Sequence, residues 1–321
     1  MKNKIYSLDF VRVVAIFMIQ LCHYFLFSDL NTGISRYFAG VGNMIFFLVS
    51  AVLYGIKYNI DNQSVDYKKF IAGRIIRLGA PTWMFLAIVI VLYILFKIPF
   101  SWFDAGLNFM FLGYLGKLPG NGHLWFLTVL MACYAEMLLL LRMRIKSQQA
   151  PWIILFMSIV MLLVGEHFGI PSIAFLTLGF FGFVFLKSDW FLQKSKSMNL
   201  WMAIAIVSIN VLCLILEYNG LFIKSRSAHF LLTGLCGLSL FSLMIRYIPN
   251  KSNRIVSFIC GISFEIYLVH HTLCAGPFIA ITHWPMNHVL NFCVLVVFSV
   301  VLAILLKLMA KHSIFSSDAA N

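Results

Sequence analysis

Polar side chains recur at helical spacing in an apolar segment near the N-terminus. Asp9, Arg12, Gln20 and His23 interrupt the apolar run 5–27. At about 100° per residue they fall within roughly one quarter of a helix circumference and form one polar stripe. Arg12 and His23 lie about 16 Å apart along the axis. Charged groups within a membrane span cost about 2.5–3.5 kcal/mol each, so this stripe indicates a function.

The chemistry that the stripe favours is proton abstraction near an anionic ligand. A buried neutral imidazole accepts a proton at physiological pH, so His23 is the candidate general base. The guanidinium of Arg12 suits an anionic donor, and Asp9 lies on the same face. The alternative is structural: Arg12 extends to the membrane interface and His23 hydrogen-bonds a neighbouring helix. The alignment of the whole set favours catalysis.

A pair of arginines is the next candidate for binding an anion. Arg74 and Arg77 are three residues apart near the start of the run 71–96, so on a regular α-helix both can face one ligand. Guanidinium groups match phosphate geometry better than the neighbouring Lys68 and Lys69 do. The alternative is that these cations only anchor the helix at the membrane surface.

Further polar residues occur near the run 124–142 and within the run 256–280. His123 and Asn121 are candidates to orient a ligand, whereas Trp125 also suits an interfacial anchor. Glu265 requires a partner within a span, and pairing with an arginine and catalysis both remain open for it. Tyr267 and His270 follow on the same helix. The acidic residues at the outer ends are interpreted as exposed carboxylates without a special role: Asp29, Asp104, Glu166 and Glu217.

The elements that must position these residues are membrane helices. The chain has 321 residues, of which 62% are hydrophobic and 11% are charged, and its mean hydropathy is +0.94. Such values lie far outside the soluble range, so lipid is the solvent. The net charge of +13 comes from short clusters between apolar runs, as membrane topology requires, and we exclude nucleic acid as a partner.

We predict an all-α integral membrane protein, a bundle of about ten transmembrane helices that forms a single domain over residues 1–321. The segment 101–118 contains Asp104, Asn108 and several glycines, so it is predicted to be re-entrant or interfacial. The predicted spans are 5–27, 37–58, 71–96, 124–142, 151–166, 171–187, 199–217, 228–247, 256–280 and 288–310.

The distribution of basic residues predicts cytoplasmic N- and C-termini. With the N-terminus inside, most Lys and Arg clusters are cytoplasmic, as the positive-inside rule requires. The clusters placed inside include Lys2, Lys4, Lys57, Lys68, Lys69, Arg74, Arg77, Lys146, Arg246, Lys307 and Lys311. The basic residues left outside are Arg36, Lys97, Lys117, Lys224 and Arg226.

The cysteines all fall within apolar runs and are predicted to be buried thiols rather than disulfides or metal ligands. They are Cys22, Cys133, Cys213, Cys236, Cys260, Cys274 and Cys293. No metal site is expected.

Five motifs follow one another over about residues 5–270: SLDFVR at 7–12 with His23, FFLVS at 46–50, FIAGRIIRL at 70–78 with Pro81, GHLWFL at 122–127 with Tyr134, and IYLVH at 266–270. In this order they resemble the motifs of the acyltransferase-3 family of bacterial membrane acyltransferases. The departures are Ala51, where the family usually has glycine, and Leu130 and Met131, where many members have acidic residues; Glu136 lies further along.

The resemblance implies a multi-pass enzyme of the bacterial cytoplasmic membrane that transfers an acyl group from acyl-CoA, with acetyl-CoA as the expected donor. The expected acceptor is a sugar hydroxyl on a cell-surface or lipid-linked glycan. On this hypothesis Arg74, Arg77 and Arg12 bind the donor, and His23 accepts the proton. The residues expected to contact the acceptor are His123, Trp125, Asn121, Tyr267 and His270. Besides membrane lipid and the acceptor, no partner or oligomeric state is indicated.

A rival hypothesis is a glycan or lipid transporter, because polar stripes also line substrate pathways. Transporters usually show two related halves. The stripe of Arg12 and His23 has no counterpart in the second half of the chain. Binding of coenzyme A distinguishes the enzyme from a pure transporter, which should show none. A sensor that binds a ligand without turnover is a third hypothesis, which the absence of measurable product would favour.

Overall fold

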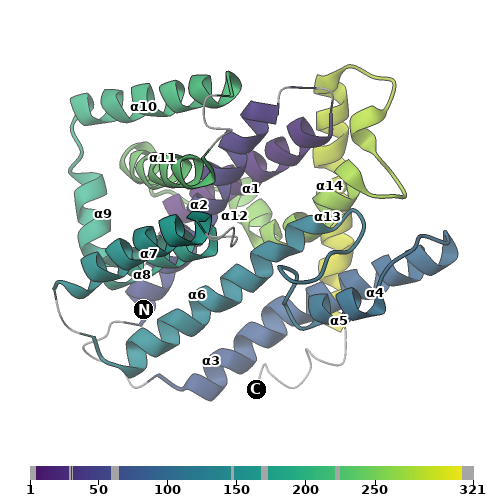
Figure 1. The fold of residues 1–321 in the computed structure, drawn as a ribbon, viewed down its shortest axis with the longest axis horizontal. Coiled ribbons are helices and arrows are strands. Elements are labelled where there is room, and N and C mark those ends of the chain that lie inside the picture. The colour runs from purple at the N-terminus through teal and green to yellow at the C-terminus, as the bar shows by residue number, and fades with distance from the viewer. Residues whose placement is uncertain are drawn as a thin grey trace. The chain divides into compact units, whose positions relative to one another are not determined.

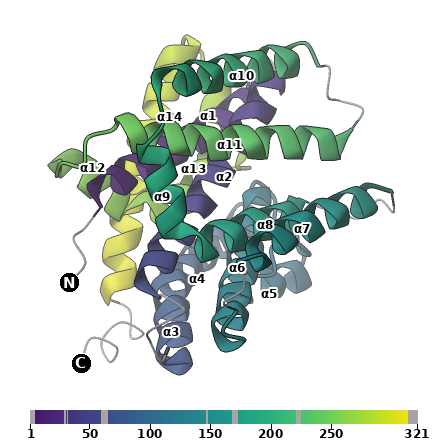
Figure 2. The same cartoon turned by 90° about the vertical axis from the view of Figure 1, so that its left-hand side faces the viewer.

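A computed structural model describes residues 5–28, 30, 32–58, 65–145, 148–167, 173–220 and 225–312 of the chain. Over these residues all regular elements are helical (Figures 1 and 2), which confirms the predicted class. By length and composition, 8 helices among the described residues are able to cross a membrane. Two further pairs of helices are bent at a short break, and the number of spans rises to 10 if each pair counts as one span. The predicted number of spans corresponds to the higher figure.

The chain divides into two compact units. Unit 1 comprises residues 1–63 and 132–260, and unit 2 comprises residues 64–131 and 261–321. The predicted single domain over 1–321 stays a prediction. The helices of unit 1 are α1 (Tyr6–Phe27), α2 (Thr32–Lys57), α7 (Ala150–His167), α8 (Ile173–Leu186), α9 (Ser188–Lys196), α10 (Leu200–Tyr218) and α11 (Arg226–Tyr247). Two helices extend over the unit boundaries in sequence: α6 (Trp125–Arg142) and α12 (Arg254–Gly261).

The core of unit 1 forms around α2. Val41, Ile45, Leu48 and Val49 are fully buried, because α2 packs against α1, α8, α10 and α11. Burying such side chains fully contributes about 1.5–3 kcal/mol each. The run predicted at 171–187 corresponds to α8, and the chain then bends by 84° into α9.

In unit 2 the first span changes its helical geometry along its length. It consists of α3 (Tyr67–Arg74), the π-helical turn η1 (Ile75–Gly79) and α4 (Ala80–Leu95). Asp66 caps α3 by accepting a hydrogen bond from Lys69 N at 3.0 Å. The π turn directly precedes Pro81, which has no N–H to donate to the carbonyl four residues earlier.

The segment predicted to be re-entrant or interfacial begins with a short helix, α5 (Trp102–Phe109). The Ser101 hydroxyl caps α5 by accepting a hydrogen bond from Asp104 N at 3.2 Å. Asn108 then donates hydrogen bonds to the carbonyls of Asp104 at 2.8 Å and Gly116 at 3.0 Å, which folds the following residues back. With 8 residues, α5 is too short to cross a bilayer, in agreement with the prediction.

The predicted span 256–280 is divided, because α12 ends at Gly261 and α13 (Ser263–Ala275) begins after Ile262. In unit 2, α13 packs against α4, α14 (His288–His312) and the short 3₁₀ helix η3 (Ile281–His283), which follows it in sequence. A second 3₁₀ helix of unit 2, η2 (Gly122–Leu124), precedes α6. Every cysteine is a free thiol, but Cys293 on α14 is exposed, so the prediction of burial was wrong for this residue.

The cytoplasmic location of both termini stays a prediction. Several residues that entered the charge argument lie outside the described part of the chain: Lys2, Lys4, Lys146 and Lys224, together with the acidic residue Asp29.

Candidate active site

The stripe predicted from the sequence lies on one unbroken helix, α1. Asp9 and Arg12 are half-buried near its start, and the thiol of Cys260 on α12 lies beside both. Nη1 of Arg12 donates a hydrogen bond to Cys260 Sγ at 3.8 Å, and that thiol donates one to Oδ1 of Asp9 at 3.5 Å. The Arg12 guanidinium also lies 6.0 Å from the ring centroid of Phe46. The motif at 46–50 therefore supplies an aromatic contact for Arg12.

Gln20, in the middle of the stripe, is more buried than its two ends. Gln20 is 3% exposed, and among the described residues its Nε2 has no hydrogen-bond partner. His23 is half-buried, and its ring stacks on that of Phe27 with a centroid distance of 6.3 Å. Nε of Arg12 is likewise buried without a described hydrogen-bond partner. Nε2 of Gln20 and Nε of Arg12 are thus shielded from water without a described protein acceptor. Such burial of a donor is costly unless a ligand accepts its hydrogen bond.

Arg74 and Arg77 lie at the junction between α3 and the π turn. Arg74, the last residue of α3, is half-buried with its guanidinium 5.6 Å from the Phe70 ring, and Arg77 is exposed within η1. A π turn accommodates an extra residue, so Arg77 points in a different direction relative to Arg74 than on a regular α-helix. The shared α-helical face assumed for this pair is therefore not the geometry found. Their role in binding the donor stays a prediction.

Glu265 has cationic neighbours within unit 2. Its carboxylate is 9% exposed and interacts electrostatically with Lys307 and Arg77. Nζ of Lys307 also donates a hydrogen bond to the carbonyl of Gly261 at 2.7 Å. The partner that a membrane-embedded carboxylate requires is thus present, and it includes one of the predicted donor ligands.

Three imidazoles gather between η2 and α13. His123 stacks on His271 with a centroid distance of 4.5 Å and lies 5.5 Å from the His270 ring. Each ring donates to a backbone carbonyl: Nε2 of His123 to Leu268 at 3.1 Å, Nδ1 of His271 to Gly120 at 2.7 Å, and Nδ1 of His270 to Tyr267 at 2.8 Å. These bonds fix which nitrogen carries the proton in each neutral ring. We call His123, His270 and His271 the histidine cluster.

The other predicted acceptor ligands support this cluster. Asn121 donates to the Tyr93 hydroxyl at 2.8 Å and accepts from the Thr272 hydroxyl at 2.9 Å. The Tyr267 hydroxyl donates to the carbonyl of His123. Trp125, at the start of α6, is half-buried. The structure thus brings Asn121, Tyr267, His123 and His270 together around α13, and it adds His271, which carried no pattern in the sequence.

Several acidic residues differ from their interpretation as exposed carboxylates. Glu217 is 0% exposed, because Arg36 and His229 surround it, so that interpretation was wrong. Glu166 accepts hydrogen bonds from the backbone N–H groups of Arg226 at 2.9 Å and Ser227 at 3.2 Å, and therefore caps α11. No signal in the local sequence indicates either contact, since the partners come from distant helices.

Among the described residues, no group of three or more His, Cys, Asp or Glu side chains is arranged to hold a metal ion. The chemistry of the stripe and the histidine cluster is that of proton acceptors and hydrogen-bond donors.

A family model described as an acyltransferase domain matches residues 5–308. The chain belongs to the acyltransferase-3 family. The match covers nearly the whole chain, including α1, the π turn, the histidine cluster and α14, and it agrees with the resemblance carried by the five motifs. This acyltransferase is therefore built largely of apolar helices, as a multi-pass membrane protein. No curated protein and no solved structure matches the chain.

Proposed function

We propose that this acyltransferase transfers an acetyl group from acetyl-CoA to a sugar hydroxyl of a cell-surface or lipid-linked glycan, in the bacterial cytoplasmic membrane. The observation that carries the proposal is the stripe of α1. It combines a half-buried imidazole at His23 with a guanidinium at Arg12 whose Nε is buried without a described partner. A family of acyltransferases supplies the reaction class.

The reaction that we propose needs a proton acceptor and anion-binding groups. The hydroxyl oxygen attacks the thioester carbonyl carbon while His23 removes its proton. The carbon–sulfur bond then breaks, coenzyme A leaves as a thiolate and takes up that proton, and the sugar keeps the new ester. A positioned base of this kind contributes about 10²–10⁴-fold to the rate.

Donor binding is assigned to arginines in this proposal. Arg74 and Arg77 suit the phosphates of coenzyme A, because guanidinium groups bind phosphate oxygens bidentately. Arg12 serves the donor from the stripe, with Asp9 and Cys260 holding its orientation through the contacts described above. The residues proposed to contact or position the acceptor are His123, Trp125, Asn121, Tyr267 and His270.

The decisive experiment compares His23→Ala with His283→Ala, a control at an exposed histidine outside the site. Purified protein is incubated with radiolabelled acetyl-CoA and with envelope glycan from a strain lacking the gene. We expect His23→Ala to lose about 10²–10⁴-fold in acetyl transfer while its affinity for coenzyme A stays unchanged. Full activity of His23→Ala would exclude His23 as the base.

A second measurement tests the donor and separates the enzyme from a transporter. Coenzyme A should bind the wild-type protein in nanodiscs, more weakly with Arg74→Gln, and normally with Lys68→Gln at the exposed neighbouring cation. A transporter of glycan or lipid has no reason to bind coenzyme A. Mass spectrometry of the surface glycan from the deletion strain should show one missing acetyl mass per modified site.

A further inference from the structure

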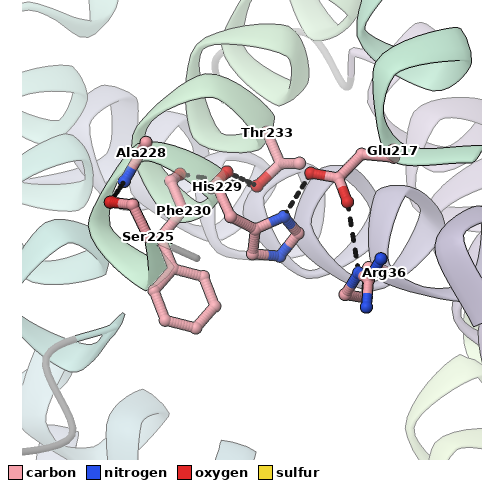
Figure 3. A network of polar contacts seen from close by, with 7 residues as sticks. All are labelled: Arg36, Glu217, Ser225, Ala228, His229, Phe230 and Thr233. Atoms are coloured by element: carbon pink, nitrogen blue, oxygen red, sulfur yellow. Dashed lines mark hydrogen bonds and ion pairs between the residues drawn. The ribbon is translucent and has the colours of Figure 1, made fainter. Parts of the chain in front are cut away.

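A fully buried carboxylate lies between an arginine and a histidine at one end of unit 1 (Figure 3). Glu217, in the last turn of α10, is 0% exposed. Its Oε2 accepts a hydrogen bond from Nε of Arg36 at 3.2 Å, and its Oε1 accepts one from Nδ1 of His229 at 2.6 Å. Because burying a carboxylate costs several kcal/mol, both contacts are needed to hold it there. We call Arg36, Glu217 and His229 the triad.

Close packing of α2 against α11 brings the triad together. Gly40 follows Arg36 by one helical turn, and Thr233 follows His229 by one turn. A Cβ atom at Gly40 would lie 2.2 Å from Thr233 Oγ1, so only glycine allows this approach. The Thr233 hydroxyl is held in turn by a hydrogen bond to the carbonyl of His229 at 2.8 Å (Figure 3). Close packing of α2 and α11 therefore fixes Arg36 and His229 relative to each other, and Glu217 reaches them from α10.

Arg36 uses only part of its hydrogen-bonding capacity within the triad. A guanidinium has five N–H donors, and the bond to Glu217 uses Nε alone rather than a bidentate fork. Among the described residues, Nη1 and Nη2 donate to no acceptor, and 34% of the Arg36 side chain is exposed. Glu217 thus holds the guanidinium through Nε, and about a third of the Arg36 side chain is exposed.

The triad lies at the same end of unit 1 as His23. Cys22, next to His23, has its sulfur 3.9 Å from the hydroxyl of Ser35, next to Arg36. One turn further on, the rings of Phe25 and Phe38 stack with a centroid distance of 6.2 Å. This end is opposite Lys57 and Arg246, the basic residues in the last turns of α2 and α11. Arg36 therefore lies at the end of α2 away from these two basic residues.

We propose that the triad is an oxyanion-binding site in which the terminal nitrogens of Arg36 bind a phosphate or carboxylate group, with Glu217 and His229 as positioning residues. The ligand is an anionic group of the acceptor or the phosphate of a lipid head group at the same membrane surface. The binding chemistry does not depend on the proposed function. Only the assignment of the anion to an acetyl acceptor rests on it.

The test uses the full-length protein in phosphatidylcholine nanodiscs, with inorganic phosphate as the probe. Bound phosphate should raise the midpoint of thermal unfolding in a saturable manner, since a ligand that binds only the folded state stabilises it. The titration is repeated with Arg74→Gln, so that any phosphate response that comes from the proposed donor site can be told apart from the response of the triad. Arg226→Gln is the matched control, because Arg226 is an exposed arginine at the start of α11.

Removing Arg36 alone would leave Glu217 buried without its cation, so Arg36→Gln is combined with Glu217→Gln to restore a neutral pair. We expect the apparent affinity for phosphate to fall by at least about tenfold in this double variant and to stay unchanged in Arg226→Gln. If Arg36 only neutralised Glu217, the double variant would keep the wild-type phosphate response, and the proposal would be wrong.

Two further arms identify the source of the anion. Phosphatidylglycerol nanodiscs should raise the unfolding midpoint of the wild type but not of the double variant if a lipid head group occupies the site. Glucose 1-phosphate should bind more tightly than inorganic phosphate if a sugar acceptor does. A wild-type protein that transfers acetyl groups but responds to none of these anions would overturn this inference and leave the proposed function intact.

Discussion

The stripe of α1 and the histidine cluster both place polar groups inside an apolar protein, but they use their hydrogen-bonding capacity differently. In the histidine cluster, each imidazole and the Tyr267 hydroxyl donate to a backbone carbonyl. In the stripe, Nε of Arg12 and Nε2 of Gln20 are buried without a described acceptor. The hydrogen bonds of the cluster therefore hold chain segments together, whereas two buried donors of the stripe have no acceptor among the described residues.

The comparison predicts that substitutions in the stripe lower activity more than stability, and that loss of a hydrogen bond around the cluster lowers stability more than activity, as expected if the cluster positions the acceptor site through the backbone. Arg12→Gln should lower acetyl transfer by about 10²–10³-fold, because it removes a preorganised cation. Its unfolding midpoint in SDS should stay close to that of Arg254→Gln, a control at an exposed arginine. A large loss of stability with little loss of rate would reverse the assignment of the stripe.

Tyr267→Phe should have the opposite effect and lower stability more than activity. It leaves the buried carbonyl of His123 without its donor, so we expect a loss of about 1–3 kcal/mol in the free energy of unfolding. Equilibrium unfolding in SDS measures the change, and Tyr247→Phe on the exposed end of α11 is the control. If Tyr267→Phe unfolds like the wild type but is inactive, the Tyr267 hydroxyl contacts substrate instead.

Thr272→Val should destabilise the protein less, by about 0.5–1.5 kcal/mol, because it removes one hydrogen bond to Asn121 at the edge of the cluster. Thr272→Ser keeps the hydroxyl and should retain most of the wild-type stability. A larger loss for Thr272→Ser than for Thr272→Val would show that the methyl group, rather than the hydrogen bond, stabilises this contact.

Gln20→Leu tests whether Gln20 in the stripe contributes to stability, and its expected effect on stability is the smallest of the four. The substitution removes a buried amide without a described partner, so the free energy of unfolding should stay within about 0.5 kcal/mol or rise. Acetyl transfer should fall, though less than with Arg12→Gln. A loss of stability like that of Tyr267→Phe would show that Gln20 belongs to the scaffold.

The sequence predicted those parts of the fold and site that depend on local periodicity. The stripe is visible because all its residues lie on one helix, where spacing alone determines the shared face. The sequence also predicted that the segment 101–118 is not a full span, because its polar residues and glycines are unsuited to lipid, and the 8-residue length of α5 agrees with this.

Contacts between distant segments were not predictable in this way. The thiol of Cys260 reaches Arg12 across 248 residues of sequence, and nothing in its apolar surroundings distinguishes it from the other cysteines. Glu217 stands at the end of an apolar run, which resembles an exposed position until Arg36 and His229 cover it. The direction of Arg77 differs from expectation for another reason, since regular helical spacing was assumed where η1 widens the helix.

The wide turn at Ile75–Gly79 lets the chain carry one extra residue between α3 and α4. Deletion of one residue there would restore ordinary α-helical winding and leave α3 and α4 close to their present orientations, because a π turn accommodates an extra residue within about one turn. The direction of Arg77 relative to Arg74 would change, since the angle between successive residues is larger in an α-helix than in a π turn. The length of this turn therefore adjusts how the two guanidinium groups diverge without reorienting the helices that carry them.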